Sequence, residues 1–452
     1  MVNEERVYFQ RLKIVLFFLL LAYFVLLVFL FNRQVIKHSY YLGLAKSQHF
    51  LAKEIPAHRG RIFASSIYQK EPFLLAGNQK LFSLNAVPRQ IKDKEETAKK
   101  IAECSGLNFQ DVFEAINNNK PSIPPLKRRL SYQEAKKIIQ SHIEGVYLLP
   151  EDVRFYPHGS SLSYVLGYVD VEGRGNYGLE QYYNEELEGD SGRFLAERDV
   201  YGRYISISQE TPPQDGKDLY LTIELPVQHK AEEIIKEAVE TYGAESGQII
   251  ILNPKTGAVI ALAASTGFNP ENYAEEAKEK GIEVFYNPMV SKLFEPGSIF
   301  KVIPMAAALE EGLVEPYTKM NLGAYIEVQG HKIWTSDRKA HGEITMTQVL
   351  ELSDNVGIVK VEQLLGKDKF FRFLTERFRL ALPLGVDLPN EVFAQLPDPK
   401  HLKEIEGATM AFGQGVAVSP LQATSVFSAI ANKGLLMRPY VVGKKVNSQG
   451  EE

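Results

Sequence analysis

The chain has 452 residues, of which 45% are hydrophobic and 24% are charged, and its formal net charge is -5. This length suits two globular domains, and the slight acidic excess lacks the basic footprint of a nucleic-acid-binding protein. The single cysteine, Cys104, excludes an intrachain disulfide and a cysteine-based metal site, and the nine histidines show no paired ligand spacing. We therefore expect no nucleic-acid partner and no metal.

The first predicted element is a membrane anchor. Residues 14–31 read "IVLFFLLLAYFVLLVFLF", an uncharged run long enough to cross a bilayer core. Two arginines and a lysine precede it, so the positive-inside rule predicts a cytoplasmic tail at 1–13 and an anchor at 14–32. A cleaved signal peptide is the alternative, but its apolar run would be shorter and would end in small residues. The bulk of the chain is then expected outside the cytoplasm, on a single-pass protein of the plasma membrane.

The segment after the anchor is mixed in texture. Short apolar stretches and many turns predict a strand-rich domain at 33–215. Within it, about 95–145, three charged segments have the apolar spacing of amphipathic helices and predict a helical insert. A polar, proline-rich linker at 208–218 marks the end of this domain, and a second domain is expected at 216–452.

The second domain opens with alternating element types. "LYLTIE" at 219–224 predicts a strand, and "VQHKAEEIIKEAVETY" predicts an amphipathic helix. "SGQIIILNPKTGAVIALAAS" holds two apolar, β-branched runs joined by a turn sequence, which is typical of a β-hairpin. Further helices are expected at 298–312, 345–366 and 418–434. The pattern favours an α/β (α+β) domain with an antiparallel sheet.

"FEPGSIFKVIPMAAALEEG" carries the sharpest local signal for chemistry. Pro296 and Gly297 break the chain, and a helical pattern begins at Ser298, with Lys301 one turn later on the same face. A serine hydroxyl becomes a nucleophile when a base takes its proton, and a lysine can be that base if burial or nearby cations lower its pKa. The alternative is a serine helix cap followed by a solvated lysine, because Ser-x-x-Lys is a common chance pattern.

A second element lies downstream in "LELSDNVGIVKV". Ser353, Asp354 and Asn355 fall at a break in a helical region. The hydroxyl could relay a proton to a leaving nitrogen, and the amide could donate a hydrogen bond to a substrate carbonyl. A helix cap is the alternative, since all three residue types favour capping positions.

Together, "EPGSIFK" followed by "SDN" resembles the penicillin-recognising serine transpeptidases in order and in separation. Upstream, "PAHRGRIF", "RFYPHGS", "GLEQYYNEELEG" and "DVYGR" resemble the pedestal motifs of class B penicillin-binding proteins. Downstream, "LPNE", "AFGQGVAVSPLQ" and "ANKG" fit the same family, and "AFGQG" is more typical of its cell-division type. The resemblance covers nearly the whole chain and implies a membrane anchor, a dimerisation-type pedestal and a β-lactamase-like transpeptidase domain.

The resemblance also implies the roles of four residues. Ser298 would be the acylated nucleophile and Lys301 its general base. Ser353 would relay protons, and Asn355 would orient the substrate amide, so that Ser298, Ser353 and Asn355 would contact the substrate. That substrate would be the D-Ala-D-Ala end of a peptidoglycan stem peptide, and β-lactams would acylate the same serine. No cofactor would be needed, and the partners would include membrane proteins of the division machinery, among them a lipid II polymerase.

The family carries a third active-site element, Lys-Thr/Ser-Gly, on a strand that follows the "GQG…PLQ" region. The Lys-Thr-Gly of this sequence lies at 255–257 instead, before the nucleophile and between the two runs of the predicted hairpin. We therefore interpret 255–257 as a turn. The catalytic triplet and the last strands of the sheet are expected beyond residue 452, and little transpeptidation is expected from a chain that ends there.

The sequence leaves two alternative functions. A non-catalytic scaffold of the division machinery would bind partners through the anchor and the pedestal, but it has no need of Ser298, Lys301, Ser353 and Asn355. A secreted β-lactamase or carboxypeptidase is disfavoured by the long pedestal and by the anchor.

Overall fold

The computed structural model describes residues 2–42, 50–198, 204–398 and 400–452. Contacts divide the chain into two units, one of Met1–Ala57 with Asp190–Gln214 and the other of His58–Gly189 with Asp215–Glu452. Both helices and strands are present, in agreement with the predicted α/β class. The larger unit contains most of the predicted pedestal together with the predicted transpeptidase domain. The predicted domain border at 215/216 therefore remains a proposal.

The smaller unit contains the N-terminal helix and a three-stranded sheet. Helix α1 (Val2–Phe31) continues into a π-helical turn at Asn32–Ile36. Between Lys13 and Ile36 it is long and apolar enough to cross a membrane, with a mean hydropathy of 3.2. Strands β1 (Phe50–Ile55), β8 (Gly192–Arg198) and β9 (Tyr204–Thr211) pair antiparallel in the order β1-β8-β9. The "DVYGR" motif at 199–203 lies outside the described residues.

The larger unit is built on a six-stranded sheet. Its order is β17-β10-β2-β3-β4, and β5 also pairs with β3. Strand β10 confirms the strand predicted at 219–224, and its alternating burial places Leu219, Leu221 and Ile223 in the core. Its neighbour β2 runs parallel to it. One sheet therefore joins a strand that precedes residues 190–214 in the chain to a strand that follows them. The strands are β2 (Ile62–Ser65), β3 (Phe73–Ala86), β4 (Lys127–Leu130), β5 (Val146–Phe155), β10 (Asp218–Glu224) and β17 (Val442–Val446).

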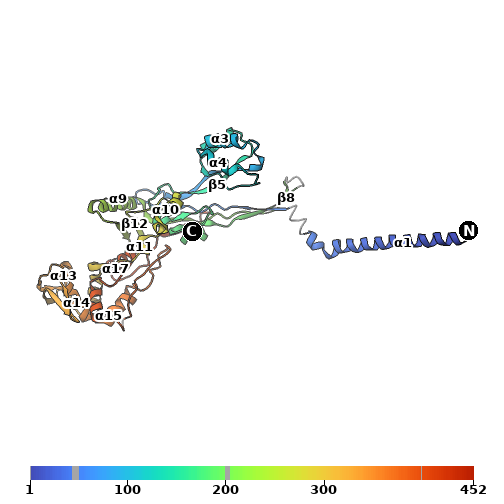
Figure 1. Cartoon of the computed structure of the whole chain (residues 1–452). Helices are drawn as coiled ribbons and strands as arrows, with labels where there is room; N and C mark the ends of the chain where they lie inside the picture. The colour runs from blue at the N-terminus through green and yellow to red at the C-terminus, as the bar shows by residue number, and fades with distance from the viewer. Residues whose placement is uncertain (1, 43–49, 199–203, 399) are drawn as a thin grey trace. The chain divides into compact units, whose positions relative to one another are not determined.

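The helical insert predicted at about 95–145 is confirmed. Helices α3 (Lys94–Ser105), α4 (Phe109–Ile116) and α5 (Tyr132–Gln140) pack their apolar faces against the second half of β3 and against β5 (Figure 1). Each helix begins at a side-chain cap, which is supplied by Asp93, Asn108 and Ser131. Strand β4, which the sequence did not predict, lies between α4 and α5.

Three motifs of the pedestal meet at one buried carboxylate. Glu180 of α7 (Gly178–Tyr182), in "GLEQ", accepts hydrogen bonds from Arg59 Nε at 2.7 Å and from Arg154 Nε at 2.7 Å. The two arginines belong to "RGRIF" and "RFYP", and Arg154 also donates to the carbonyl of Gly60. A buried carboxylate is tolerated when it is paired and hydrogen-bonded. The motifs therefore hold the first strands of the large sheet to α7.

The rest of the larger unit contains a β-hairpin with helices packed on it, and a further group of helices and short strands. The hairpin is formed by β11 (Gln248–Leu252) and β12 (Val259–Ala264), and helix α9 (Leu225–Tyr242) packs on β12. Helices α13, α14 and α15 lie together in Figure 1, and α14 packs against α12 and α16. The helices are α6 (Ser163–Leu166), α8 (Asn184–Glu188), α10 (Tyr273–Lys280), α11 (Pro288–Ser291), α12 (Val302–Glu310), α13 (Met346–Glu351), α14 (Asn355–Leu365), α15 (Lys367–Arg372), α16 (Glu404–Ala411) and α17 (Pro420–Ala431). The remaining strands are β6 (Tyr168–Val169), β7 (Gly175–Asn176), β13 (Lys319–Leu322), β14 (Tyr325–Val328), β15 (His331–Trp334) and β16 (Gly342–Thr345).

Candidate active site

Ser298 lies on a tight helical turn at the entrance to α12. The sequence predicted an α-helix from 298, but Gly297–Lys301 forms a 3-10 turn and the α-helix begins at Val302. The reason is Pro304, which has no N–H for an α-helical bond to the carbonyl of residue 300. Because residues i and i+3 eclipse each other in 3-10 geometry, Ser298 and Lys301 share one side of the turn. Ser298 is exposed, whereas Lys301 is buried.

The "AFGQGVAV" loop forms backbone hydrogen bonds with the segment that precedes Ser298. Gly297 donates its N–H to the carbonyl of Gly413 at 3.0 Å, and Phe294 exchanges two 3.0 Å backbone bonds with Val418. Gly413 has a φ of +80°, and a Cβ there would lie 2.1 Å from the carbonyl oxygen of Gly297. A side chain at 413 is therefore excluded both by the backbone conformation and by the contact.

Lys301 is the buried cation of the site. Its side chain is 2% exposed, and Nζ donates to the carbonyl of Ser353 at 2.5 Å and to Ser353 Oγ at 3.0 Å. Burial lowers the pKa of Lys301 to about 8, although the nearby charge of Asp354 acts in the opposite direction. Among the described residues no hydrogen bond joins Ser298 Oγ to Lys301, and such bonds are often long before a substrate binds.

In the Ser-Asp-Asn loop, Asp354 caps a helix and Ser353 contacts Lys301. Ser353 connects α13 to α14 with a φ of +52°, which is a strained conformation for a residue with a side chain. Asp354 caps α14 by accepting from the N–H of Gly357 at 2.8 Å. The helix-cap alternative is thus right for Asp354, while both oxygens of Ser353 face Lys301.

Both polar neighbours of Ser353 hold one further loop, residues 335–341. Asn355 Nδ2 donates to the carbonyl of Trp334 at 2.9 Å, just before this loop. At its other end, His341 Nδ1 lies 2.5 Å from Asp354 Oδ2. The hydrogen bond with Asp354, followed by the one with Asp337, raises the pKa of His341. Nothing in the sequence predicts this arrangement except a single histidine before Gly342.

The Lys-Thr-Gly triplet at 255–257 is a turn, as predicted. Gly257 donates to the carbonyl of Asn253 at 2.8 Å and closes the loop between β11 and β12 with a φ of +83°. A Cβ on Gly257 would lie 2.2 Å from the carbonyl oxygen of Arg438. Lys255 and Thr256 are exposed, and glycine is required here by the backbone rather than by chemistry.

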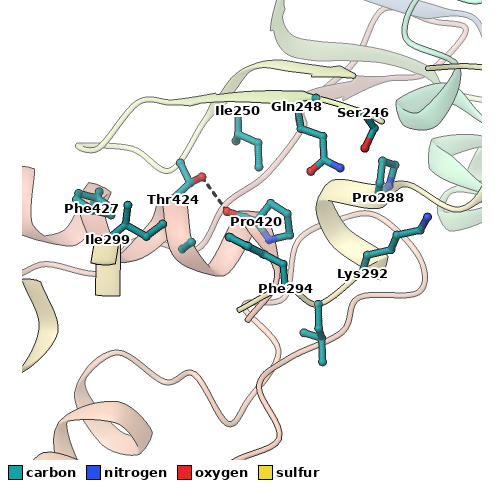
Figure 2. A pocket seen from close by; sticks show the side chains of 13 residues that line it. Ser246, Gln248, Ile250, Pro288, Lys292, Phe294, Ile299, Pro420, Thr424 and Phe427 are labelled. Carbon is teal, nitrogen blue, oxygen red and sulfur yellow. Dashed lines mark hydrogen bonds between the residues drawn. The ribbon is translucent and has the colours of Figure 1, made fainter. Parts of the chain in front are cut away.

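A cavity of about 680 Å³ lies beside β11. Figure 2 shows Gln248 and Ile250 of β11 on one side and Pro420 and Thr424 of α17 on the other, where Thr424 Oγ1 donates to the carbonyl of Pro420. Ile299, the neighbour of Ser298, also lines it. Ser298, Lys301 and Ser353 are not among its lining residues.

Comparison with known protein families agrees with this geometry. Residues 247–452 match the family model described as "Penicillin binding protein transpeptidase domain", and residues 54–221 match "Penicillin-binding Protein dimerisation domain". The chain belongs to the penicillin-binding proteins. As in the sequence interpretation, Ser298, Lys301, Ser353 and Asn355 all fall within the matched transpeptidase region.

Two relatives of this penicillin-binding protein carry informative names. It is 32% identical over 376 residues to "Stage V sporulation protein D" of Bacillus subtilis, which covers 81% of the chain and 57% of that protein. It is 30% identical over 347 residues to "Peptidoglycan D,D-transpeptidase FtsI" of Escherichia coli, covering 76% of the chain and 58% of the relative. The chain therefore spans less than three fifths of the length of these two relatives.

Solved structures show the same fold. A peptidoglycan synthetase from Bifidobacterium adolescentis has a TM-score of 0.68 at 24% identity, over 89% of this chain and 76% of the other. Penicillin binding protein 3 from Mycobacterium tuberculosis in complex with aztreonam has a TM-score of 0.64 at 23% identity, over 88% and 69%. At these identities the likeness concerns the fold alone.

Proposed function

We propose that this protein is a membrane-anchored serine D,D-transpeptidase that cross-links peptidoglycan stem peptides, with Ser298 as its nucleophile. The observation that carries the proposal is the buried amine of Lys301, which contacts both oxygens of Ser353 beside an exposed serine. The transpeptidase family match and the printed name of the Escherichia coli relative support the same reaction.

In the acylation step, the neutral amine of Lys301 accepts the proton of Ser298 as Oγ attacks the carbonyl of the penultimate D-alanine. A lysine with a pKa of about 8 supplies a useful neutral fraction near neutral pH, which an ordinary lysine does not. The C–N bond then breaks, and the proton passes through Ser353 to the leaving amine of the terminal D-alanine. Asn355 orients the peptide through its side-chain amide.

In the second step, the amine of a neighbouring stem peptide attacks the ester carbonyl. Its proton returns through Ser353 and Lys301 to Ser298 Oγ as the C–O bond breaks, which regenerates the free serine. A β-lactam enters the first step in place of the peptide, because its strained amide presents an equivalent carbonyl. Its ring-opened leaving group stays attached and blocks the second step.

The membrane setting is part of the proposal. The helix from Lys13 to Ile36 supports a single anchor, and the cationic residues before it support a cytoplasmic N-terminus with the transpeptidase outside. The "AFGQG" motif and the FtsI relative favour a role in division, beside membrane partners that include a lipid II polymerase.

Covalent labelling by a fluorescent penicillin tests the proposal. We expect the protein to form a labelled band that disappears in Ser298→Ala and falls by at least about a hundredfold in rate in Lys301→Ala. Two matched controls should label normally: Ser448→Ala removes an exposed serine, and Lys255→Ala removes the lysine of the turn at 255–257. A folded protein that takes no label, or a Ser298→Ala variant that still does, contradicts the proposal and favours the scaffold.

A further inference from the structure

An exposed aromatic pair borders the proposed site. Tyr325 of β14 and Trp334 of β15 face each other across a two-stranded hairpin, with ring centroids 4.9 Å apart. The two residues are 43% and 40% exposed, and Trp334 is the only tryptophan in the sequence. Large aromatic side chains left open to solvent beside a polar site are typical of ligand contacts. The carbonyl of Trp334 accepts the hydrogen bond from Asn355, so the pair lies directly next to the Ser-Asp-Asn loop.

Cationic side chains surround this pair. The guanidinium of Arg338 lies 5.9 Å from the Trp334 ring centroid, and Lys332 Nζ lies 4.6 Å from that of Tyr325. Lys339 follows Arg338 in the same exposed loop. In the described part of the chain none of these three cations forms an ion pair, although the whole protein has a net charge of -5. The carboxylate beside Arg338, that of Asp337, contacts His341 and the N–H of Lys339 instead.

The loop that carries Arg338 is held in place rather than loose. Thr335 is buried, and its hydroxyl contacts the carbonyls of Ala324 and Lys339 at 3.2 and 3.0 Å. Arg338 itself has a φ of +58°, a conformation that costs a residue with a side chain about 1 kcal/mol or more. Strain of this kind persists where the surroundings fix the backbone, and it is concentrated at functional sites. The backbone that carries the guanidinium is therefore held in place.

We propose that Tyr325, Trp334 and Arg338, with Lys339 beside them, form a subsite for an anionic segment of the peptide substrate. A peptide whose amide is oriented by Asn355 extends over Trp334, where the ring contacts its apolar part and Arg338 pairs with a carboxylate upstream of the reacting D-alanines. This inference rests on the proposed function and makes it more specific. The substrate class becomes an acidic stem peptide in preference to one whose carboxylates are amidated.

The test uses Trp334 as the reporter of binding. In Ser298→Ala protein, which cannot be acylated, a stem pentapeptide with free carboxylates upstream of D-Ala-D-Ala is titrated against its carboxamide counterpart. We expect the free acid to bind about threefold to tenfold more tightly and to change the tryptophan fluorescence. Equal binding of the two peptides, or binding by calorimetry without a fluorescence change, overturns the subsite. Equal binding would also be the result if the aromatic pair contacted a neutral sugar.

Substitution of the cation completes the test. Arg338→Gln in the Ser298→Ala background should abolish the preference for the acidic peptide. Arg89→Gln, which changes an exposed arginine in the 3-10 turn Pro88–Gln90, should keep it. Arg338→Gly, which suits the positive φ, should also lose the preference and rules out a folding artefact. A preference that survives both changes at 338 overturns the inference. Penicillin labelling of the unmodified protein is measured separately. Loss of labelling contradicts the proposed function, whereas normal labelling without a preference for the acidic peptide contradicts only the subsite.

Discussion

The proposed reactivity of Lys301 depends on the burial of its amine. Since burial lowers its pKa to about 8, roughly a tenth of the population is neutral at pH 7. We expect the rate of acylation by a fluorescent penicillin to rise about tenfold per pH unit below 8 and to level off above it. Rates measured between pH 6 and 9.5 check this, with Lys255→Ala as the control that keeps the same inflection. A flat profile would show that the amine of Lys301 is not the base.

Ser353 combines a reactive group with a strained backbone, and two substitutions separate these contributions. Ser353→Gly and Ser353→Ala both remove the hydroxyl and should both slow acylation. Only glycine suits a φ of +52°, so we expect Ser353→Gly to be more stable than Ser353→Ala by about 1 kcal/mol. Thermal denaturation of the two variants measures the difference. Equal stabilities would mean that the loop between α13 and α14 relaxes at little cost.

At this scale the family resemblance implied that Ser353 relays protons beside the base Lys301, and the two side chains are in hydrogen-bond contact. The sequence did not predict that Asp354 would bind His341, or that Asn355 would bind the backbone of Trp334. Those contacts depend on how two hairpins fold back onto the start of α14. The spacing of residues along the sequence does not predict such long-range contacts.

Among the elements, the loop between α16 and α17 positions the turn that carries Ser298. Gly413 and Gly415 both have positive φ values, +80° and +70°, but their surroundings differ. A Cβ at 413 would lie 2.1 Å from the Gly297 carbonyl, whereas the nearest atom to one at 415 is Thr409 Oγ1 at 3.7 Å. Gly415→Ala should therefore cost only the backbone penalty of about 1 kcal/mol.

Gly413→Ala should cost more than Gly415→Ala and should slow acylation further, because relief of the clash moves Gly297 and with it Ser298. Paired measurements of thermal stability and penicillin labelling check both statements. If the two variants behave alike, the close approach of the two glycines does not position the nucleophile.

The predicted elements succeeded where the pattern was long and periodic, as in the insert, α9 and the hairpin. They failed in detail where a single residue overrode the pattern. Pro304 converts the start of the helix expected at 298–312 into a 3-10 turn. Strand β4 is only four residues long and carries three cationic side chains, so it has no alternation by which to recognise it.

At the scale of the whole larger unit, stability depends on sheet pairing and on the ion pairs of Glu180. Glu180→Gln leaves Arg59 and Arg154 without their buried counter-charge, and we expect a loss of about 3–5 kcal/mol in the free energy of unfolding. Glu172→Gln, which removes an exposed partner of Arg174, should cost less than about 1 kcal/mol.

Because β2 pairs with β10, residues 58–189 and 215–452 should unfold together. Heating Glu180→Gln should therefore abolish penicillin labelling at the same, lowered temperature at which the helical insert melts. Separate transitions for the two segments would contradict a shared sheet. The sequence could not predict this pairing, since Ile62 and Leu219 are far apart in the chain and parallel neighbours have no joining turn to reveal them.

The two units are joined by the chain at three places, after Ala57, after Gly189 and after Gln214. Strand β1 enters through the first junction, and the β8–β9 hairpin leaves and returns through the other two, bonded to β1 along its length. A single cut in the backbone at 57/58 would thus leave the N-terminal helix attached through interstrand hydrogen bonds. Cleavage at 57/58 alone therefore does not separate this helix from the larger unit, whereas cleavage between the helix and β1 does.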